Sequence, residues 1–304
     1  MVEFTCNICG AQNQVEQVAR EAPSCKCDSN VRVRALVHLL SVELFGQDIP
    51  LVDFPRLPGI RGVGMSDHRS YADILAKKFD YTNTFYDREP RLDFTESHPG
   101  MEGTYDFILS ADVLEHVAPP VDRTLQEVQR LLKPTGFLVA TVPCVPEDQL
   151  REHFPELHEY RIVILGGSAV LVNRRRDGTL ETRTDLSFHG GIGSTLEMRQ
   201  LTVTELHAKL LGSGFREVQF LFDNSSEMGI VFDEDSSRPL VARKEPFTFD
   251  RATQLQLMSE WRSSETRVWE ERERARTMAD QIAMASDSRW VQLGRAFGVG
   301  PRFR

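Results

Sequence analysis

Residues suited to chemistry gather in two places of this 304-residue sequence. The first is an amino-terminal cluster, Cys6-x-x-Cys9 followed after fifteen residues by Cys25-x-Cys27. Two close cysteine pairs can bind one tetrahedral zinc ion, although the second pair has one spacer residue where two are usual. Because four cysteine ligands leave no open position for water, we expect a structural zinc knuckle in residues 1–30. Reduced, unligated thiols are the alternative.

The second place is "DFILSADVLEHV" (106–117), an apolar run that ends in Asp112, Glu115 and His116. The run is typical of a buried strand, and an open α/β sheet binds ligands at the carboxyl ends of its strands. An imidazole at that end titrates near neutrality, so His116 is our first candidate for a general base acting on a substrate hydroxyl. Glu115 is equally consistent with catalysis and with a first-turn acid that complements a helix dipole.

More polar candidates follow in a histidine-bearing segment, residues 147–200. His189 precedes two glycines that would let a loop bring it close to a reaction centre, so it is the second candidate for the base. His153 and Arg199 are candidates for substrate contacts. An isolated loop histidine is more often a satisfied polar residue than a catalyst, and the sequence leaves that alternative open.

Regular elements must position these residues. Residues 31–46 have helical apolar spacing up to Gly46, and Arg32 and Arg34 in this segment are either a solvated edge or part of an anion site. From residue 59 short apolar runs alternate with amphipathic stretches, which predicts a parallel sheet covered by helices. "GIRGVGMSD" (59–67) is typical of a glycine-rich turn after a strand, with a helix after it.

Residues 106–143 resemble the class I S-adenosylmethionine-dependent methyltransferases. The buried strand, the "VLEHV" helix start and the "LLKPTG" turn before a further strand occur in the order of that family. The resemblance implies a Rossmann-like, doubly wound α/β sheet over residues 31–245, with a substrate lid at about 147–200. It also implies S-adenosylmethionine as the cofactor and an oxygen, nitrogen or carbon atom as the methyl acceptor.

The resemblance also implies roles for residues near the glycines. Gly62 and Gly64 match the first two glycines of the family's cofactor loop. Two positions depart from the family pattern: Ile60 replaces an acid, and Ser66 replaces the third glycine. Asp67 is our candidate for the missing carboxylate.

Three further acids receive cofactor roles from the resemblance. Asp87 ends the segment "YTNTFYD", twenty-three residues after Gly64, where the family places the acid that binds the ribose hydroxyls. Asp93 follows at another expected strand end, near the adenine. Asp112 is expected against the methionine part of the cofactor or against the substrate.

Residues 246–304 form a tail of different character. Eight residues spaced alternately by four and three form a heptad seam with two polar defects: Leu257, Trp261, Ser264, Val268, Glu271, Ala275, Met278 and Ile282. The tail is either a homodimeric coiled coil or a single solvated helix. Its end, "SRWVQLGRAFGVGPRF", resembles the tails of proteins of surface-polysaccharide biosynthesis.

Charge and hydropathy limit the partners. The formal net charge of −9 disfavours nucleic acid, and no apolar run is long enough to span a bilayer. The amino terminus lacks the pattern of a signal peptide, so we expect a cytoplasmic enzyme. Cysteine clusters ahead of such domains resemble those of sugar methyltransferases, which favours a carbohydrate acceptor in polysaccharide or nucleotide-sugar metabolism. The alternative is a catalytically degenerate protein of the same fold that serves in binding or assembly.

Overall fold

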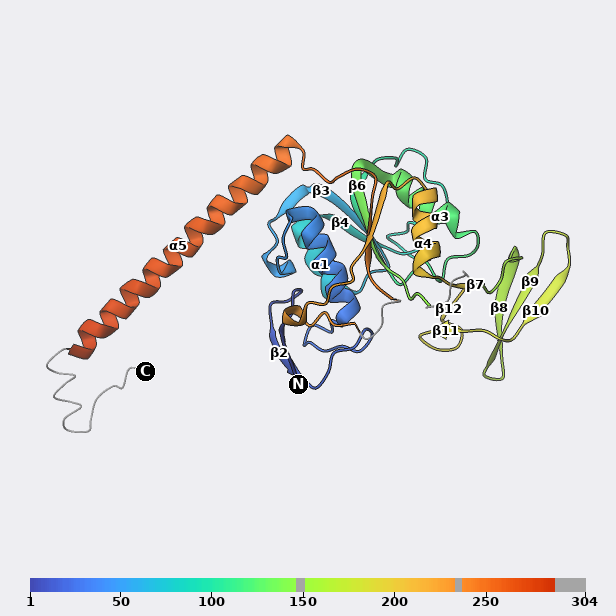
Figure 1. The fold of residues 1–304 in the computed structure, drawn as a ribbon, viewed down its shortest axis with the longest axis horizontal. Coiled ribbons are helices and arrows are strands. Elements are labelled where there is room, and N and C mark those ends of the chain that lie inside the picture. The colour runs from blue at the N-terminus through green and yellow to red at the C-terminus, as the bar shows by residue number, and fades with distance from the viewer. Residues whose placement is uncertain (146–150, 233–236, 288–304) are drawn as a thin grey trace. The chain divides into compact units, whose positions relative to one another are not determined.

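The computed structural model describes residues 1–145, 151–232 and 237–287 (Figure 1). The chain divides into two compact units, Met1–Phe249 and Asp250–Arg304. None of the described helices is long and apolar enough to cross a membrane.

A six-stranded sheet forms the centre of the first unit, in the order β14-β15-β6-β5-β3-β4. Neighbouring strands among β4, β3, β5 and β6 are parallel, whereas β15 is antiparallel to both of its neighbours. The predicted α/β sheet is therefore confirmed. The strands are β3 (Leu57–Met65), β4 (Phe79–Thr84), β5 (Tyr105–Ala111), β6 (Leu132–Thr141), β14 (Glu217–Phe220) and β15 (Leu240–Arg243).

Helices cover both faces of this sheet. Helix α1 lies on one side, and helices α3 and α4 lie on the other (Figure 1). Helix α1 begins after Asn30, whose side chain accepts a hydrogen bond from the backbone N–H of Val33, and it ends at Gly46, whose φ is 69°. The helices are α1 (Val31–Phe45), α2 (Arg69–Lys78), α3 (Val121–Leu131) and α4 (Val203–Gly212), with short 3₁₀ turns at Leu51–Asp53 and Ser226–Met228.

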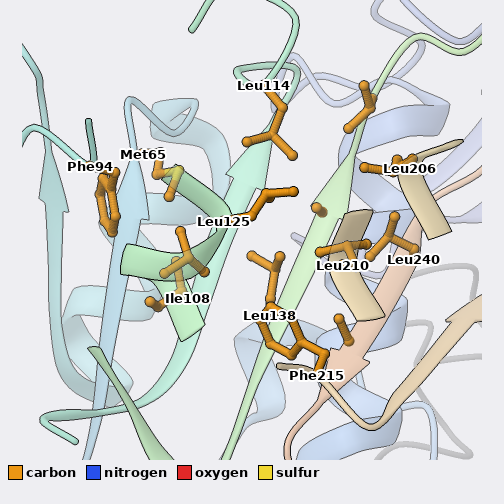
Figure 2. Packing of buried hydrophobic residues seen from close by; sticks show 14 of the residues in the cluster. Met65, Phe94, Ile108, Leu114, Leu125, Leu138, Leu206, Leu210, Phe215 and Leu240 are labelled. Atoms are coloured by element: carbon orange, nitrogen blue, oxygen red, sulfur yellow. The ribbon is translucent and has the colours of Figure 1, made fainter. Parts of the chain in front are cut away.

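Alternating strand residues divide the core between the two faces. Ile108 and Leu138 pack with Leu125 of α3 and Leu210 of α4 (Figure 2). Phe107, which precedes Ile108 in β5, stacks on the ring of Phe137 in β6. Because both faces are buried, the middle of β5 (107–109) and of β6 (137–140) is continuously apolar, as is typical of a parallel sheet.

The expected glycine turn is wrong, because Gly62 and Gly64 lie inside strand β3. A Cβ atom at Gly62 would collide with the ring of Phe107, and one at Gly64 would collide with the carboxylate of Asp67. Close packing between strands therefore explains these glycines. The turn comes later, at Ser66, whose φ is 59°.

Short strands build the segments outside the central sheet. Strands β1 (Val2–Thr5) and β2 (Gln12–Val15) form a hairpin beside the cysteines. Strands β8 (Glu159–Leu165), β9 (Ser168–Arg174) and β10 (Leu180–Arg183) form an antiparallel sheet. Strands β9 and β10 are joined by a hairpin turn that contains Asp177 and Gly178. The remaining strands are β7 (Arg151–Glu152), β11 (Phe188–His189), β12 (Thr195–Leu196) and β13 (Arg199–Gln200).

The second unit contains the long helix α5 (Arg251–Asp287), which confirms the predicted helical tail. Its described apolar residues are largely exposed, including Trp261, Val268, Met278 and Ile282 of the heptad seam. The final apolar patch, residues 288–303, lies outside the described residues.

Candidate functional site

A cavity of about 940 Å³ opens at the carboxyl ends of the parallel strands. Met65 and Ser66 line it at the end of β3, Thr84 at the end of β4, and Ala111 and Asp112 at the end of β5. This is the position at which open α/β sheets bind ligands.

Two further segments complete the cavity. We call Arg20, Glu21 and Arg32 the amino-terminal wall, since they come from the cysteine-bearing segment and the start of α1. The lid wall consists of residues from strands β11 and β12 and their surroundings, namely His189, Ser194, Thr195, Leu196 and Met198. The cavity therefore joins segments that are far apart in the sequence.

Asp112 is held in place by the amino-terminal wall. Its two carboxylate oxygens each accept a hydrogen bond of 2.8 Å from Arg20, and Oδ1 accepts another from the hydroxyl of Thr141. Arg32 lies 3.2 Å from the same carboxylate. Burial alone would raise the pKa of Asp112, but the two guanidinium groups lower it below its usual value, so Asp112 is charged at neutral pH. The sequence reasoning missed Arg20.

Glu115 has the opposite environment. Its side chain is 1% exposed, and neither carboxylate oxygen has a hydrogen-bond partner among the described residues. Burial, with a smaller contribution from the charge of Asp112, raises the pKa of Glu115 to about 8. A first-turn capping role does not fit, since residues 114–116 form a turn and helix α3 begins only at Val121.

His116 and His189 come together beside Glu115, with 4.7 Å between their ring centroids. The Nε2 atom of His116 lies 3.5 Å from Oε1 of Glu115, and Nδ1 of His189 lies 3.9 Å from the same oxygen. Burial lowers the pKa of His116, so its imidazole is neutral at pH 7 and able to accept a proton. Both residues line the cavity, as their candidate role requires.

Glu197 links this cluster to a third histidine. One of its oxygens lies 3.2 Å from Nε2 of His189, and the other lies 2.9 Å from Nε2 of His153. His153 is thus behind the lid wall and is not among the described residues that line the cavity, so its expected contact with substrate is wrong. The sequence reasoning missed Glu197, although it lies between His189 and Arg199.

Five other expected site residues also lie outside the described cavity lining: Gly62, Gly64, Asp67, Asp87 and Arg199. Arg199 is fully buried, where it donates hydrogen bonds to Glu152 and to the carbonyl of Leu114, so it supports the lid instead of binding substrate. Asp67 turns inward and accepts a hydrogen bond from the hydroxyl of Tyr81.

Asp87 is exposed, because β4 ends at Thr84, three residues before it, and leaves Tyr86 as the cavity residue. Asp93 does line the cavity, as expected. It follows a loop and not a strand, and its side chain accepts hydrogen bonds from Thr95.

The four amino-terminal cysteines converge on one point, and all are free thiols. Their sulfur atoms all lie within 4.8 Å of one another, with 3.7 Å between Cys6 and Cys27 and 3.5 Å between Cys9 and Cys25. Zn–S bonds of about 2.3 Å in a tetrahedron place sulfur atoms about 3.8 Å apart. The residues therefore fit a zinc ion.

Comparison with known proteins adds to this geometry. Residues 38–164 match a family model described as "Methyltransferase domain". No curated protein matches the sequence significantly.

Solved structures show distant likeness. The CurJ carbon methyltransferase is 15% identical over 72% of this chain and 56% of its own, with a TM-score of 0.43. A toxoflavin-precursor N1-methyltransferase from Burkholderia thailandensis is 15% identical over 77% of this chain and 94% of its own, with a TM-score of 0.35. A sugar N-methyltransferase from Streptoalloteichus is 11% identical over 69% and 85%, with a TM-score of 0.39. The chain thus spans about half the length of the CurJ structure. The region that matches the methyltransferase model includes strands β3, β4, β5 and β6, whose carboxyl ends lie at the cavity.

Proposed function

We propose that this enzyme transfers a methyl group to a hydroxyl of a small carbohydrate acceptor in polysaccharide or nucleotide-sugar metabolism. The observation that carries the proposal is the position of His116 and His189 in one cavity with Asp93 and Asp112. Carboxylates suited to the cofactor and imidazoles suited to a hydroxyl proton thus share a single cavity. A cavity of about 940 Å³ has the size of sites that bind drug-sized ligands.

The cofactor fits the strand-end side of this cavity. Asp93 offers a carboxylate for hydroxyl groups of the nucleoside, near Thr84 and Tyr86 at the end of β4. Arg20 and Asp112 supply opposite charges that suit the carboxylate and ammonium groups of the methionine part. When bound, S-adenosylmethionine supplies an electrophilic methyl group on a good leaving group. The protein then mainly has to position the acceptor.

The acceptor fits beside the lid wall. Ser194 and Thr195 carry hydroxyl groups there, and Tyr160 adds an aromatic ring with a hydroxyl. Such groups bind polyhydroxylated molecules through hydrogen bonds and contacts with sugar faces. His116, with a neutral imidazole, accepts the proton of the acceptor hydroxyl, and His189 is the second candidate for that role.

Other parts of the proposal concern the appendages and the setting. The cysteine cluster binds a structural zinc ion that fixes the amino-terminal wall, because Arg20 lies only five residues before Cys25. Exposed apolar residues of α5 support a homodimer through this helix, in which the heptad seams of two copies pair. We place the enzyme in the cytoplasm, with no nucleic-acid partner.

Ligand-induced stabilisation tests the cofactor part of this proposal. S-adenosylmethionine and S-adenosylhomocysteine at one hundred times their dissociation constants should each stabilise the protein by about 2.7 kcal/mol. Absence of a thermal shift with either compound would favour the degenerate alternative.

The acceptor needs a separate test, because cofactor binding says nothing about its identity. Incubation with methyl-labelled cofactor and a panel of sugar nucleotides should label at least one sugar. Labelling of only non-carbohydrate acceptors would contradict the carbohydrate assignment while leaving the methyltransferase intact.

A further inference from the structure

The general-base mechanism does not use the buried carboxylate of Glu115. Its carboxylate is buried, yet no hydrogen-bond donor among the described residues reaches either oxygen. A buried polar group without a partner costs free energy, and a buried carboxylate costs more than a neutral group. Another partner must therefore compensate Glu115 when the site functions.

The hydrogen bonds of the two neighbouring histidines fix the direction of their lone pairs. Nδ1 of His116 lies 2.9 Å from the carbonyl oxygen of Leu196, which can only accept, so Nδ1 carries the proton and Nε2 carries a lone pair. Nε2 of His189 donates in the same way to the carboxylate of Glu197, which leaves the lone pair on Nδ1. These two lone-pair nitrogens are the atoms that lie 3.5 Å and 3.9 Å from Glu115.

When Glu115 is ionised, three electron-rich groups thus face one another without a donor between them. We propose that Glu115, His116 and His189 bind a divalent first-row transition-metal ion such as Zn²⁺. One ligand atom from each residue lies within 4.8 Å of the others. Two imidazole nitrogens and one carboxylate oxygen are a donor set of catalytic zinc sites, which keep a further position open.

Glu197 strengthens this assignment. A histidine that binds a metal usually donates its other N–H to a carboxylate or a carbonyl, which fixes its tautomer and its orientation. Glu197 does so for His189, and the carbonyl of Leu196 does so for His116. His153, held by the other oxygen of Glu197, fixes that carboxylate in turn.

This inference rests on the proposed function and deepens it, because the metal would face the cavity that receives the acceptor. With the metal bound, the lone pairs of His116 and His189 are used in coordination, so the metal takes over the role of the base. A hydroxyl oxygen in the open position would lose its proton to solvent more readily, as metal-bound water does. That oxygen then forms the bond to the methyl carbon as the carbon–sulfur bond breaks, and the electron pair of that bond stays on sulfur. The proposed acceptors are then carbohydrates with a hydroxyl group that can bind the metal ion.

Metal counting tests the site without cofactor or acceptor. The full chain is dialysed to equilibrium against Zn²⁺ under reducing conditions, and the zinc bound per chain is measured. Glu115→Gln and His189→Asn should each bind one zinc fewer than the wild type, whatever the cysteines hold. The control His158→Gln changes another lid histidine, outside the cluster, and should bind as much as the wild type. Equal zinc in the wild type and in both cluster variants would overturn the proposal.

A second measurement needs no variant, so a folding defect cannot obscure it. Co²⁺ added to wild-type protein that holds one zinc ion per chain should broaden the ring resonances of His116 and His189 and leave those of His158 and His207 sharp. Unaffected rings of His116 and His189 would contradict the site.

Glu197→Ala should weaken Co²⁺ binding about 10–100-fold. Metal binding without any thermal shift by S-adenosylmethionine would separate a failure of the proposed function from a failure of this site.

Discussion

The amino-terminal wall and the lid wall line the same cavity but treat charge in opposite ways. Arg20 and Arg32 pair with Asp112 and Glu21, so the ionic groups of the first wall are mutually compensated. Beside the lid wall, the buried Glu115 faces two imidazole nitrogens, and neither of its oxygens has a hydrogen-bond partner among the described residues. Ion pairs fix the geometry of the first wall, whereas buried groups without a partner can bind a ligand or a proton. We therefore propose that the first wall serves binding geometry and that the second serves chemistry.

Removal of the cysteine cluster should break the first wall and give the largest effect. Cys9→Ser removes one of four thiolates, and metal binding contributes about 10 kcal/mol or more to the folding of small zinc sites. We expect the variant to bind one zinc ion fewer than the wild type and the amides of residues 1–30 to lose protection from hydrogen exchange, while the central sheet stays folded. Metal analysis and hydrogen-exchange mass spectrometry measure the two effects.

Cys144→Ser is the matched control, since Cys144 is a free cysteine outside the cluster. It should retain zinc and amino-terminal protection. A Cys9→Ser variant that keeps both would mean that packing, including the buried Arg34, holds this segment without metal.

Substitution of the histidines should break the second wall while sparing the first. His116→Gln or His189→Asn should lower turnover by about 100-fold or more at the residue that acts on the acceptor. Affinity for S-adenosylmethionine should stay nearly unchanged, because neither residue contacts the expected cofactor side. Steady-state kinetics and calorimetry separate the two quantities, with His158→Gln as the control. Normal turnover in both variants would show that the enzyme works by positioning alone.

Loss of Arg20 should weaken the first wall by a smaller amount. Removal of one partner of a buried ion pair costs about 3–5 kcal/mol, and the partial exposure of Arg20 and Asp112, 22% and 14%, reduces our expectation for Arg20→Gln to about 2 kcal/mol. The paired Asp112 has a lowered pKa in the folded protein. Its contribution is therefore present above the unfolded-state pKa of about 3.9 and is lost as the pH falls below it.

Urea denaturation at several pH values measures this dependence. The difference between wild type and Arg20→Gln should be full at pH 7 and should shrink as the pH falls below about 4. Arg69→Gln removes an exposed pair with Asp73 and should cost at most about 0.5 kcal/mol. A cost for Arg20→Gln no larger than that of this control would mean that the first wall is not held by its ion pairs.

Sequence patterns sufficed for the elements with strong periodicity or strong chemistry. The strand before Asp112, the helix ended by Gly46 and the convergence of the four cysteines all follow from local spacing. The position of the glycines inside a strand could not be predicted from local spacing. A glycine needed for close packing against Phe107 of a neighbouring strand looks the same in sequence as a glycine of a turn.

Tertiary contacts determine which of the polar candidate residues are free to line the cavity. Arg199 has the residue type of a substrate contact, but only the fold reveals that Glu152 and the carbonyl of Leu114 occupy it. Arg20 lies 92 residues from Asp112, and no local pattern connects the two. Glu197 could have been predicted from the sequence, because its carboxylate lies between His189 and Arg199, two expected site residues of the lid.

The smallest expected effect concerns the cofactor side of the cavity, where we now expect Asp93, and not Asp87, to contact the cofactor. Asp93 lines the cavity and Asp87 does not. A hydrogen bond to a charged group contributes about 1.5–3 kcal/mol, so Asp93→Asn, which keeps the shape and removes the charge, should weaken S-adenosylmethionine binding about tenfold. Asp87→Asn is the matched control and should leave the affinity within about twofold, because an exposed carboxylate outside the cavity loses nothing on neutralisation. Calorimetric titration of both variants at equal salt measures the ratio. A larger loss for Asp87→Asn would show that the loop after β4 closes over the cofactor and brings Asp87 to the ribose, which would make the cofactor side, and not only the lid, a moving part of the site.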